Sequence, residues 1–480
     1  MTLVIVSNRV ARPKPDLPMT GGLAAALLPA IERSGAIWVG ASGNLGSSER
    51  DSFAEIEALG AGALATVDLP QAYYRGYYEG FSNSALWPAL HSRTDLIRTS
   101  GDDYKAYREV NGFMARALLR FCRPDAIYWV QDYHFLPLGH ELRRLGVKQP
   151  IGFFLHTPWP NRTCMLGVPH HRELVRAMLA YDLIGFQTDE DRHNFEDYVQ
   201  QDLGMPVSDG VVGAGLSRLQ AFPIGIDVEQ FAARAIKAAA RPEISRLRAS
   251  LQGAKLAIGV DRLDYSKGLA NRIQAFDRLL VAEPNLRRAF TLLQIAVPSR
   301  TQIASYSKLQ SELATLVGEV NGRHGEIDWV PIRYVNRAFP QPTLAGFYRA
   351  AQIGVVTPLH DGMNLVAKEY VAAQDPSDPG VLVLSEFAGA AKELDAAVLV
   401  NPHDIDGMAR ALSLALMMTR EERVERWKAM IQTLKIHSIH AWFSDFCQAL
   451  GDTRMAALPP ATKVVPSLTS RAGQGAVTQH

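Results

Sequence analysis

Short runs of consecutive apolar residues recur along the whole chain, and they restrict its fold more than any other feature. Residues 151–155 (IGFFL) and 353–357 (IGVVT) show no alternation with polar residues. Such runs are typical of strands covered on both faces, as in parallel sheets flanked by helices. The other strands that we expect are 3–6, 37–39, 126–130, 183–186, 221–223, 256–260, 291–296, 327–332, 381–384 and 397–400.

Longer amphipathic segments, such as residues 104–120 and 268–283, separate these runs. The repeated order of strand and helix predicts an α/β protein with two doubly wound, Rossmann-like domains. We expect the boundary in FPIGIDVEQF, where Pro223 ends a strand and Gly225 can act as a hinge. The predicted limits are residues 1–225, residues 226–457 and a mobile tail, residues 458–480, which is rich in Pro, Ser, Thr and Gly.

Composition narrows the classes of function. The 480 residues carry a net charge of only +1, which argues against a protein that binds nucleic acid or membranes through bulk charge. Any anionic ligand must then be held by locally placed Arg and Lys. The three cysteines fit no zinc motif or disulfide framework, and the first apolar run is too short for a signal peptide or a membrane span. We therefore expect a cytoplasmic protein.

The stretch TPLHDGMNLVAKEYVAAQDP joins an apolar strand to a helix through a polar turn. A helix that starts near Leu365 would direct the free N–H groups of Asn364, Leu365 and Val366 toward a ligand such as a phosphate. Glu369, one turn later, could accept two hydroxyls, for instance those of a ribose. The alternative is a plain strand-to-helix connection with a surface Lys-Glu pair.

A second polar cluster, GVDRLDYSKGL, also follows an apolar run. Arg262 and Lys267 could neutralise a diphosphate at the end of this strand. Asp264 could instead form a surface ion pair with either cation.

Other candidates stand after strands in the first half. Arg9 follows the first strand, and Gly21 and Gly22 allow close approach of the backbone before a helix, although a simple loop fits them as well. The segment YYEGFSNSALWPALH alternates aromatic and polar residues, which suits either sugar binding or core packing. Asp132, His134 and His156 follow two apolar strands, and Arg300 follows a strand in the second half; structural histidines and a capping or surface arginine are the alternatives. Together these residues describe a cleft between two domains, lined for a diphosphate and a polyhydroxylated ligand.

The motifs SNR, GGL, FSNSALWP, QDYH, GFFLHTPWP, YDLIGFQT, FPIGID, RLDYSKG, DGMNLVAKEYVAAQDP and VLVLSEFAGAA, in this order from Val4 to about Phe443, resemble the retaining trehalose-6-phosphate synthases. The resemblance implies a glycosyltransferase of the GT-B type with two Rossmann-like domains. It implies transfer of glucose from UDP-glucose to glucose 6-phosphate, giving α,α-trehalose 6-phosphate and UDP, without a metal or another cofactor.

The resemblance also implies roles for single residues. The catalytic set is Arg262, Lys267, His156 and Asp361: the two cations hold the donor diphosphate, while His156 and Asp361 hold the donor glucose. The donor-binding set is Gly21, Gly22, Phe339 near the uracil, Leu365, Val366, Ala367, Lys368 and Glu369. The acceptor-binding set is Arg9, Tyr78, Trp87, Asp132 and Arg300, with the two arginines as a phosphate clamp.

The sequence departs from the family pattern in two places. Ala41 stands in Gly-Ala-Ser-Gly where relatives have tryptophan, and residues 161–174 (NRTCMLGVPHHREL) differ from the usual segment. Two other functions therefore stay open: transfer to a different sugar phosphate, or a sugar-phosphate sensor without catalysis. The intact Arg262, Lys267, Asp361 and Glu369 argue against the sensor. The sequence also leaves open the donor base, regulation and whether the chain forms a homo-oligomer.

Overall fold

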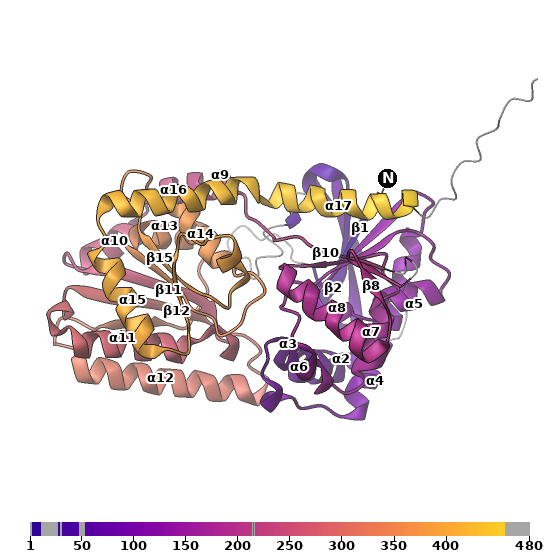
Figure 1. Cartoon of the computed structure of the whole chain (residues 1–480), viewed down its shortest axis with the longest axis horizontal. Helices are drawn as coiled ribbons and strands as arrows, with labels where there is room; N and C mark the ends of the chain where they lie inside the picture. Colours follow the sequence, from indigo (N-terminus) through magenta and orange to yellow (C-terminus); the bar gives the residue numbers. More distant parts are fainter. Residues whose placement is uncertain are drawn as a thin grey trace, which may run out of the picture.

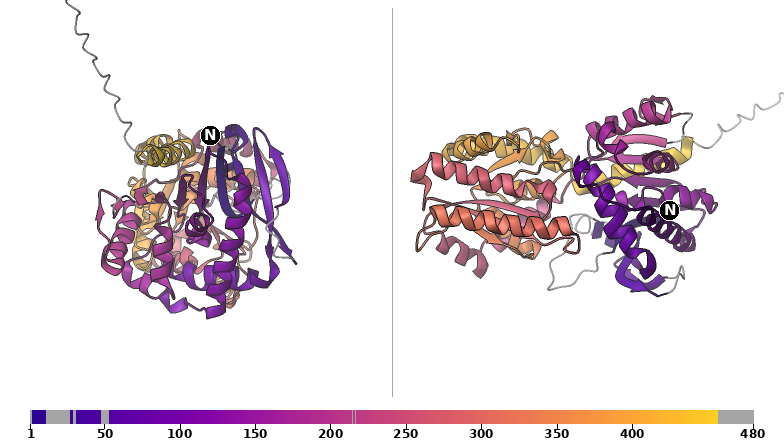
Figure 2. Two further views of the ribbon diagram at one scale, coloured as in Figure 1. Left: turned by 90° about the vertical axis from the view of Figure 1, so that its right-hand side faces the viewer. Right: turned by 90° about the horizontal axis from the view of Figure 1, so that it is seen from below.

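Two helix-covered sheets lie side by side, one from each half of the chain (Figures 1 and 2). The structure is a computed structural model, and it describes residues 2–10, 27–28, 31–47, 53–213, 215 and 217–456. The predicted α/β class and its two sheets are confirmed. The domain limits themselves stay a prediction, and the proposed tail lies outside the described residues.

The N-terminal sheet has the order β3-β4-β2-β1-β5-β6-β7-β10-β9-β8 in the described residues. Its strands are β1 (Thr2–Arg9), β2 (Ile37–Gly46), β3 (Phe53–Leu59), β4 (Gly62–Pro70), β5 (Ala126–Gln131), β6 (Ile151–Phe154), β7 (Leu183–Phe186), β8 (Val207–Ser208), β9 (Val211–Val212) and β10 (Ser217–Ala221). The seven strands from β4 to β10 in this order pair in parallel, whereas β3 and the short β8 and β9 pair antiparallel at the edges.

Helices cover this sheet on both sides (Figure 1). They are α2 (Gln71–Tyr74), the π-helix η1 (Arg75–Leu86), α3 (Trp87–Leu90), α4 (Gly101–Leu118), α5 (Leu138–Arg144), α6 (Arg162–Leu166), α7 (His171–Met178) and α8 (Asp189–Leu203). Short 3₁₀ turns, η2 (Thr94–Leu96), η3 (Leu119–Phe121) and η4 (Tyr133–Phe135), join them to the strands. A π-helix such as η1 is rare and often marks a functional site.

The C-terminal sheet is parallel throughout its described strands, in the order β13-β12-β11-β14-β15-β16. Its strands are β11 (Lys255–Arg262), β12 (Phe290–Val297), β13 (Ile332–Val335), β14 (Ile353–Val356), β15 (Val381–Ser385) and β16 (Val398–Val400). The helices are α9 (Val228–Ala238), α10 (Pro242–Ser250), α11 (Leu269–Ala282), α12 (Ala304–His324), α13 (Gln341–Ala350), α14 (Leu365–Ala373), α15 (Ile405–Met417), α16 (Arg420–Ile436) and α17 (Ile439–Ala456), with 3₁₀ turns η5 (Tyr265–Lys267), η6 (Pro284–Leu286) and η7 (Gly389–Lys392).

The last helix returns to the N-terminal domain. In Figure 1, α17 runs from the end of α16 across the N-terminal half. Phe446 stacks on Trp129 of β5, with ring centroids 4.4 Å apart, and Trp442 lies 4.8 Å from the same ring. A Cβ at Gly152 of β6 would lie 2.8 Å from the Phe446 ring, so the glycine lets the helix approach the sheet closely. The N-terminal core therefore includes the C-terminal helix.

The chain passes between the domains at 224–226 and again at 437–438, and the two passages touch. A Cβ at Gly225 would lie 2.0 Å from the carbonyl oxygen of His437, and the N–H of Ile439 donates to Ile226 (3.2 Å). Gly225, predicted as a hinge, thus lies where the two passages meet.

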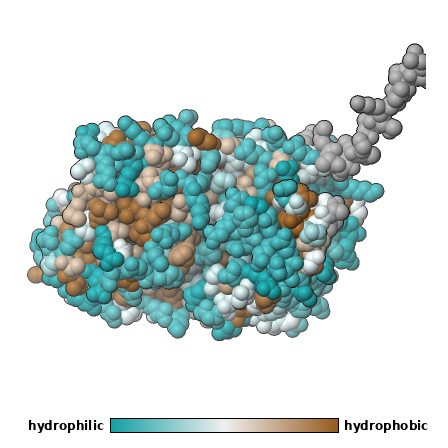
Figure 3. Space-filling view, in the orientation of Figure 1, coloured by the Kyte–Doolittle hydropathy of each residue, from teal (hydrophilic) through white to brown (hydrophobic). Residues whose placement is uncertain are grey.

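The face in Figure 3 is mainly hydrophilic, and its apolar residues gather over the C-terminal half. Among the described residues, no helix is both long and apolar enough to cross a membrane.

Candidate active site

The predicted polar residues stand after the carboxyl ends of strands in both domains, and they face each other. Asp132 follows β5 and His156 follows β6, while Arg262, Arg300 and Asp361 follow or end β11, β12 and β14. Parallel α/β sheets bind ligands at this edge, so the predicted cleft has the expected position.

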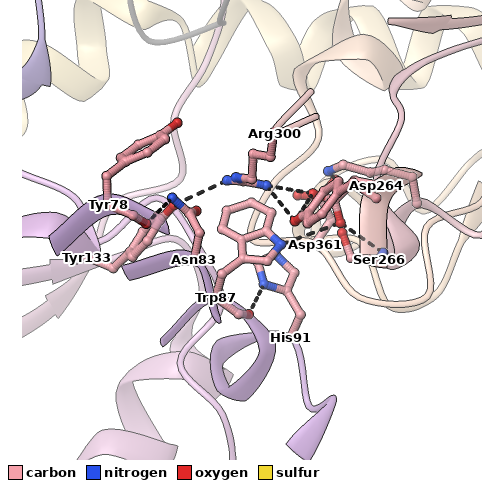
Figure 4. Close-up of polar contacts among 11 residues, drawn as sticks. Tyr78, Asn83, Trp87, His91, Tyr133, Asp264, Ser266, Arg300 and Asp361 are labelled. Atoms are coloured by element: carbon pink, nitrogen blue, oxygen red, sulfur yellow. Dashed lines mark hydrogen bonds and ion pairs between the residues drawn. The ribbon is translucent and has the colours of Figure 1, made fainter. Parts of the chain in front are cut away.

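Arg300 lies at the centre of the contact between the domains (Figure 4). Its guanidinium donates to Asp264 Oδ2 (2.7 Å), Tyr306 Oη (2.9 Å) and Tyr133 Oη (3.2 Å). Its Cζ lies 3.8 Å from the centroid of the Trp87 ring, a cation–π contact. The side chain is only 6 % exposed, so neither a surface role nor a capping role describes it.

Asp264 is fully buried and does not form the surface ion pair considered from the sequence. Burial alone would raise its pKa, but the guanidiniums of Arg300 and Arg262 hold the pKa of Asp264 below its usual range. Asp264 therefore stays ionised, as a carboxylate beside the guanidiniums of Arg300 and Arg262.

Arg262 and Lys267 flank this anion. Arg262 is exposed, with its Cζ 5.1 Å from the Trp87 centroid, and Lys267 Nζ pairs with Asp361 Oδ2 at 2.5 Å. Asn364 donates to the same oxygen (2.9 Å). Although burial opposes it, the ammonium of Lys267 lowers the pKa of Asp361. The sequence predicts Arg262, Lys267 and Asp361 in one site, but it does not predict that Lys267 pairs with Asp361.

Helix α14 starts at Leu365, as predicted. Its N-cap, Asn364, has a φ of 76° and gives no side-chain hydrogen bond to the first turn. The N–H groups of Leu365, Val366 and Ala367 are therefore available for an anion.

Lys368 and Glu369 are not a surface pair. Lys368 is fully buried, and its ammonium donates to the carbonyl of Ile224 (2.8 Å) and pairs with Glu393. The side chain of Lys368 is thus engaged by Ile224 and Glu393, and the place of Lys368 in the donor-binding set stays a prediction. Burial raises the pKa of Glu369 to about 7, against the effects of Gln341, Arg234 and Tyr348 nearby.

Asp132 and His156 lie together on the N-terminal side. Asp132 has a φ of 72°, and its Oδ1 accepts the backbone N–H of His156 (3.2 Å); burial raises the pKa of Asp132 to about 6. The His156 ring bonds Gln131 Oε1 (2.8 Å), and burial lowers the pKa of His156 to about 3. His156 is therefore neutral near pH 7.

The other predicted residues that the structure describes have contacts of their own. The exposed Arg9 places a guanidinium nitrogen 2.7 Å from where a Cβ of Gly43 would be, and Arg9 pairs in register with Ala41, which is 7 % exposed. Tyr78 stacks on His134 at 5.9 Å. Phe339 packs at 5.3 Å against Phe347 of α13. Gly21 and Gly22 lie outside the described residues.

Sequence reasoning missed Tyr133 and Tyr306 as polar partners in the cleft, whereas Asn83 belongs to the aromatic and polar segment considered for sugar binding. Tyr133 donates to Asn83 Oδ1 (2.9 Å), and Asn83 donates to the carbonyl of Tyr78 (2.8 Å), five residues earlier in η1. Tyr306 donates to Asp264 (3.2 Å). Tyr133 and Asn83 stand within the quoted motifs QDYH and FSNSALWP, whereas Tyr306 carried no signal. The unusual segment 161–174 forms α6 and part of α7, and Arg162 pairs with Asp202 of α8 at 2.5 Å.

Two cavities lie between the domains. One of about 660 Å³ has walls from both, among them His91, Ser266 and Asp361. A larger one of about 900 Å³ has Gly80 of η1 and Ile303 among its walls, and none of the predicted site residues is among its described lining residues. In the part of the chain that the structure describes, no group of three or more His, Cys, Asp or Glu could hold a metal ion.

Comparisons with known proteins agree with this geometry. Residues 12–452 match glycosyltransferase family 20. A trehalose-6-phosphate synthase of Sinorhizobium fredii is 45% identical over 458 residues, which cover 93% of this chain and 98% of that protein.

Solved structures are similar over the whole fold. An α,α-trehalose-phosphate synthase (UDP-forming) from Burkholderia xenovorans in complex with glucose-6-phosphate has a TM-score of 0.90 and 44% identity, covering 93% of this chain and 99% of that chain. A structure described as trehalose-6-phosphate from E. coli bound with UDP-2-fluoro glucose has a TM-score of 0.88 and 39% identity, covering 94% and 99%.

Proposed function

The chain belongs to glycosyltransferase family 20, and from that premise we propose that it is a retaining trehalose-6-phosphate synthase of the GT-B fold. It moves glucose from UDP-glucose to glucose 6-phosphate, giving α,α-trehalose 6-phosphate and UDP. The observation that carries this proposal is the cleft itself, where Arg262, Lys267 and the start of α14 lie beside Arg300 and Trp87. Arg262, Lys267 and the helix start suit a diphosphate, whereas Arg300 and Trp87 suit a sugar phosphate.

The donor side stabilises the leaving group. Negative charge develops on the diphosphate as its bond to the glucose C1 breaks, and fixed cations with a helix start lower the energy of that state. Arg262, Lys267 and the N–H groups of Leu365 and Val366 supply them. Glu369 accepts the ribose hydroxyls, and Phe339 lies near the uracil.

Lys267 has to exchange partners when the donor binds. In the free protein its ammonium is neutralised by Asp361. With the donor present, the diphosphate takes over Lys267, and Asp361 is free to hold glucose hydroxyls with His156. Because His156 is neutral, it orients the sugar and polarises its hydroxyls.

The acceptor binds across the cleft. Arg9 and Arg300 hold its phosphate, and Tyr78, Trp87 and Asp132 hold its ring. Its attacking hydroxyl forms the new bond to C1 on the face that the diphosphate leaves, and the hydroxyl proton passes to a departing phosphate oxygen. Configuration is thereby retained.

An acceptor panel tests the proposal by measuring UDP release from UDP-glucose. Glucose 6-phosphate should be the best acceptor, and free glucose should be worse by roughly 10²-fold in kcat/KM, because charge-assisted bonds to a phosphate contribute about 1.5–3 kcal/mol each. If another sugar phosphate releases UDP and glucose 6-phosphate does not, Ala41 marks a changed acceptor pocket. Binding without any release would favour the sensor.

Cations of the chain stabilise the leaving group in this proposal, so transfer should persist in excess EDTA. Loss of activity in EDTA that magnesium or manganese restores would contradict it. The cytoplasmic location and a homo-oligomeric state stay predictions; light scattering on the purified protein tests the second.

A further inference from the structure

Asp264 makes more contacts in the cleft than the donor and acceptor roles explain. Its Oδ2 accepts from Arg300 (2.7 Å) and Tyr306 (3.2 Å), and its Oδ1 accepts from the Ser266 N–H (3.1 Å) and Trp87 Nε1 (3.4 Å). Each oxygen of the Asp264 carboxylate therefore accepts two hydrogen bonds. Trp87 comes from the N-terminal domain and the other three donors from the C-terminal domain, as Figure 4 shows for the labelled residues.

A buried carboxylate is costly unless it is paired and hydrogen-bonded, so this arrangement is specific. Two of the four donors, Arg300 and Trp87, are the groups proposed to meet the acceptor. Asp264 holds the guanidinium over the indole ring, which lies 3.8 Å from Arg300 Cζ.

The backbone of Arg300 needs such support. Its φ of 49° lies in the left-handed region, which is unfavourable for a residue with a long side chain and persists only where the surroundings hold it. From Arg300 the contacts continue through Tyr133 and Asn83 to the carbonyl of Tyr78, on the proposed acceptor wall. Asp264 is thus the fixed end of a chain of contacts that crosses the domain boundary.

We propose that Asp264 is a positioning residue: it fixes Arg300 for the acceptor phosphate and Trp87 for the acceptor ring, without touching either substrate. The inference rests on the proposed function for the identity of the acceptor. This positioning role differs from one in which Asp264 only neutralises the charge of the neighbouring cations. If Asp264 only neutralised its neighbours, its removal would strengthen the binding of every anion in the cleft.

The test is Asp264→Asn, which keeps the size of the side chain but places its NH2 group against donors in either orientation of the amide: Arg300 and Tyr306 on one side, or Ser266 N–H and Trp87 Nε1 on the other. KM for glucose 6-phosphate should rise roughly 10- to 100-fold, the loss expected for a charge-assisted hydrogen bond, whereas the Kd of UDP should stay within about threefold or decrease. Tighter binding of both glucose 6-phosphate and UDP would overturn the proposal in favour of charge balance. Equal weakening of both would indicate a structural role.

Asp261→Asn is the matched control. Asp261 lies three residues earlier, in β11, and pairs with Arg272 at 2.6 Å; both side chains are almost fully buried, at 3 % and 1 % exposure. This variant should lose stability while KM for glucose 6-phosphate changes by less than about threefold. A similar rise of KM in both variants would contradict a specific role of Asp264.

Two further variants make the result independent of folding losses. In the background of Arg300→Ala, Asp264→Asn should raise KM less than about threefold further, because the two residues act as a unit; additive effects would overturn the proposal. If Asp264→Asn does not fold, Tyr306→Phe removes one bond to Oδ2 together with the bond that Tyr306 Oη accepts from Arg300, and it should raise KM about three- to tenfold with unchanged UDP binding. If wild type uses another sugar phosphate, the proposed function fails while the same comparison still tests Asp264 with that acceptor.

Discussion

Neighbouring residues of one helix serve different parts of this molecule. Lys368 points to the passage between the domains, where it meets Ile224 and Glu393, whereas Glu369 stands among Gln341, Arg234 and Tyr348. About 100° of rotation per residue separates such neighbours. The sequence shows that Lys368 and Glu369 are adjacent, but it does not show where their side chains point. The partners of Lys368 come from segments 144 and 25 residues away.

The pKa of Glu369, raised to about 7 by burial, gives a pH prediction. The ribose hydroxyls donate to a carboxylate, so donor binding favours the ionised form, which is lost as the pH falls below about 7. With glucose 6-phosphate saturating, kcat/KM for UDP-glucose should rise between about pH 6 and pH 8. Glu369→Gln should remove this rise and lower kcat/KM roughly 10- to 100-fold.

A flat wild-type profile would contradict the assignment of Glu369. Asp132, whose pKa burial raises to about 6, is the other carboxyl of the site that titrates nearby. It faces the acceptor in the proposal, so saturation with acceptor separates its effect from that of Glu369.

Lys368→Met should destabilise the protein by about 3 kcal/mol, because it leaves the carboxylate of Glu393, 6 % exposed, with only the half-exposed His437 as a partner. The same change at Lys308, whose pair with Glu312 is mostly exposed, should alter stability by less than about 0.5 kcal/mol. Chemical denaturation compares the two variants. Similar midpoints would show that the buried pair does not stabilise the fold.

At the scale of elements, continuous apolar runs predicted strands well and other patterns did not. Strands β6 and β14 lie at their predicted positions, since each is buried along its whole length. The hairpin of β3 and β4 was missed, because β3 (FAEIEAL) is largely exposed and carries no apolar run. Two predicted strands were displaced. β13 begins only at Ile332, not at 327, and Ile327 is fully exposed. β10 spans Ser217–Ala221, so the strand predicted at 221–223 ends where it was expected to begin.

The turn between β11 and α11 depends on Gly268. Its φ is 64°, and a Cβ there would lie 2.2 Å from the carbonyl oxygen of Thr357. Gly268→Ala should therefore move Lys267 and lower kcat/KM for UDP-glucose by roughly 10²-fold, by analogy with the loss of one group that stabilises the transition state. Steady-state kinetics with UDP-glucose as the varied substrate measures it.

Gly146→Ala is the control for Gly268→Ala, since it separates backbone strain at a positive φ from a steric conflict of the new Cβ. Gly146 also has a positive φ, 87°, but nothing lies within 4 Å of a Cβ there. This variant should lose some stability and keep its activity. Full activity of Gly268→Ala would mean that the turn does not position Lys267.

For the whole molecule, the proposed roles make UDP and the acceptor depend differently on how the domains meet. The groups proposed to hold the diphosphate and the ribose are Arg262, Lys267, Glu369 and the start of α14, and they belong to the C-terminal domain. The proposed acceptor site takes Arg300 from that domain and Arg9, Tyr78 and Trp87 from the other. The sequence placed these residues at strand ends. It could not pair Asp264 with Trp87, 177 residues away, because that contact forms only when the domains meet.

Gly225→Ala tests this difference at the hinge, because the new Cβ would lie 2.0 Å from the His437 carbonyl oxygen and push the two passages apart. KM for glucose 6-phosphate should rise by roughly tenfold, as a small displacement of positioning groups costs much, while UDP affinity changes little. Titration calorimetry and initial rates measure both. Gly451→Ala in α17 is the control, because nothing lies within 4 Å of a Cβ there. If Gly225→Ala weakened glucose 6-phosphate and UDP equally, the proposed difference between the two sites would be contradicted.

The return of α17 to the N-terminal sheet bears on how this protein can be cut into pieces. A fragment that ends at residue 225 would lack the helix that covers Trp129, Phe154 and Phe222, and these rings would face water together. Contiguous apolar patches of this kind favour aggregation. A usable N-terminal fragment therefore has to carry residues 439–456 on a tether, and a circular permutant that opens the hinge passage is a better starting point for engineering than two separately expressed halves.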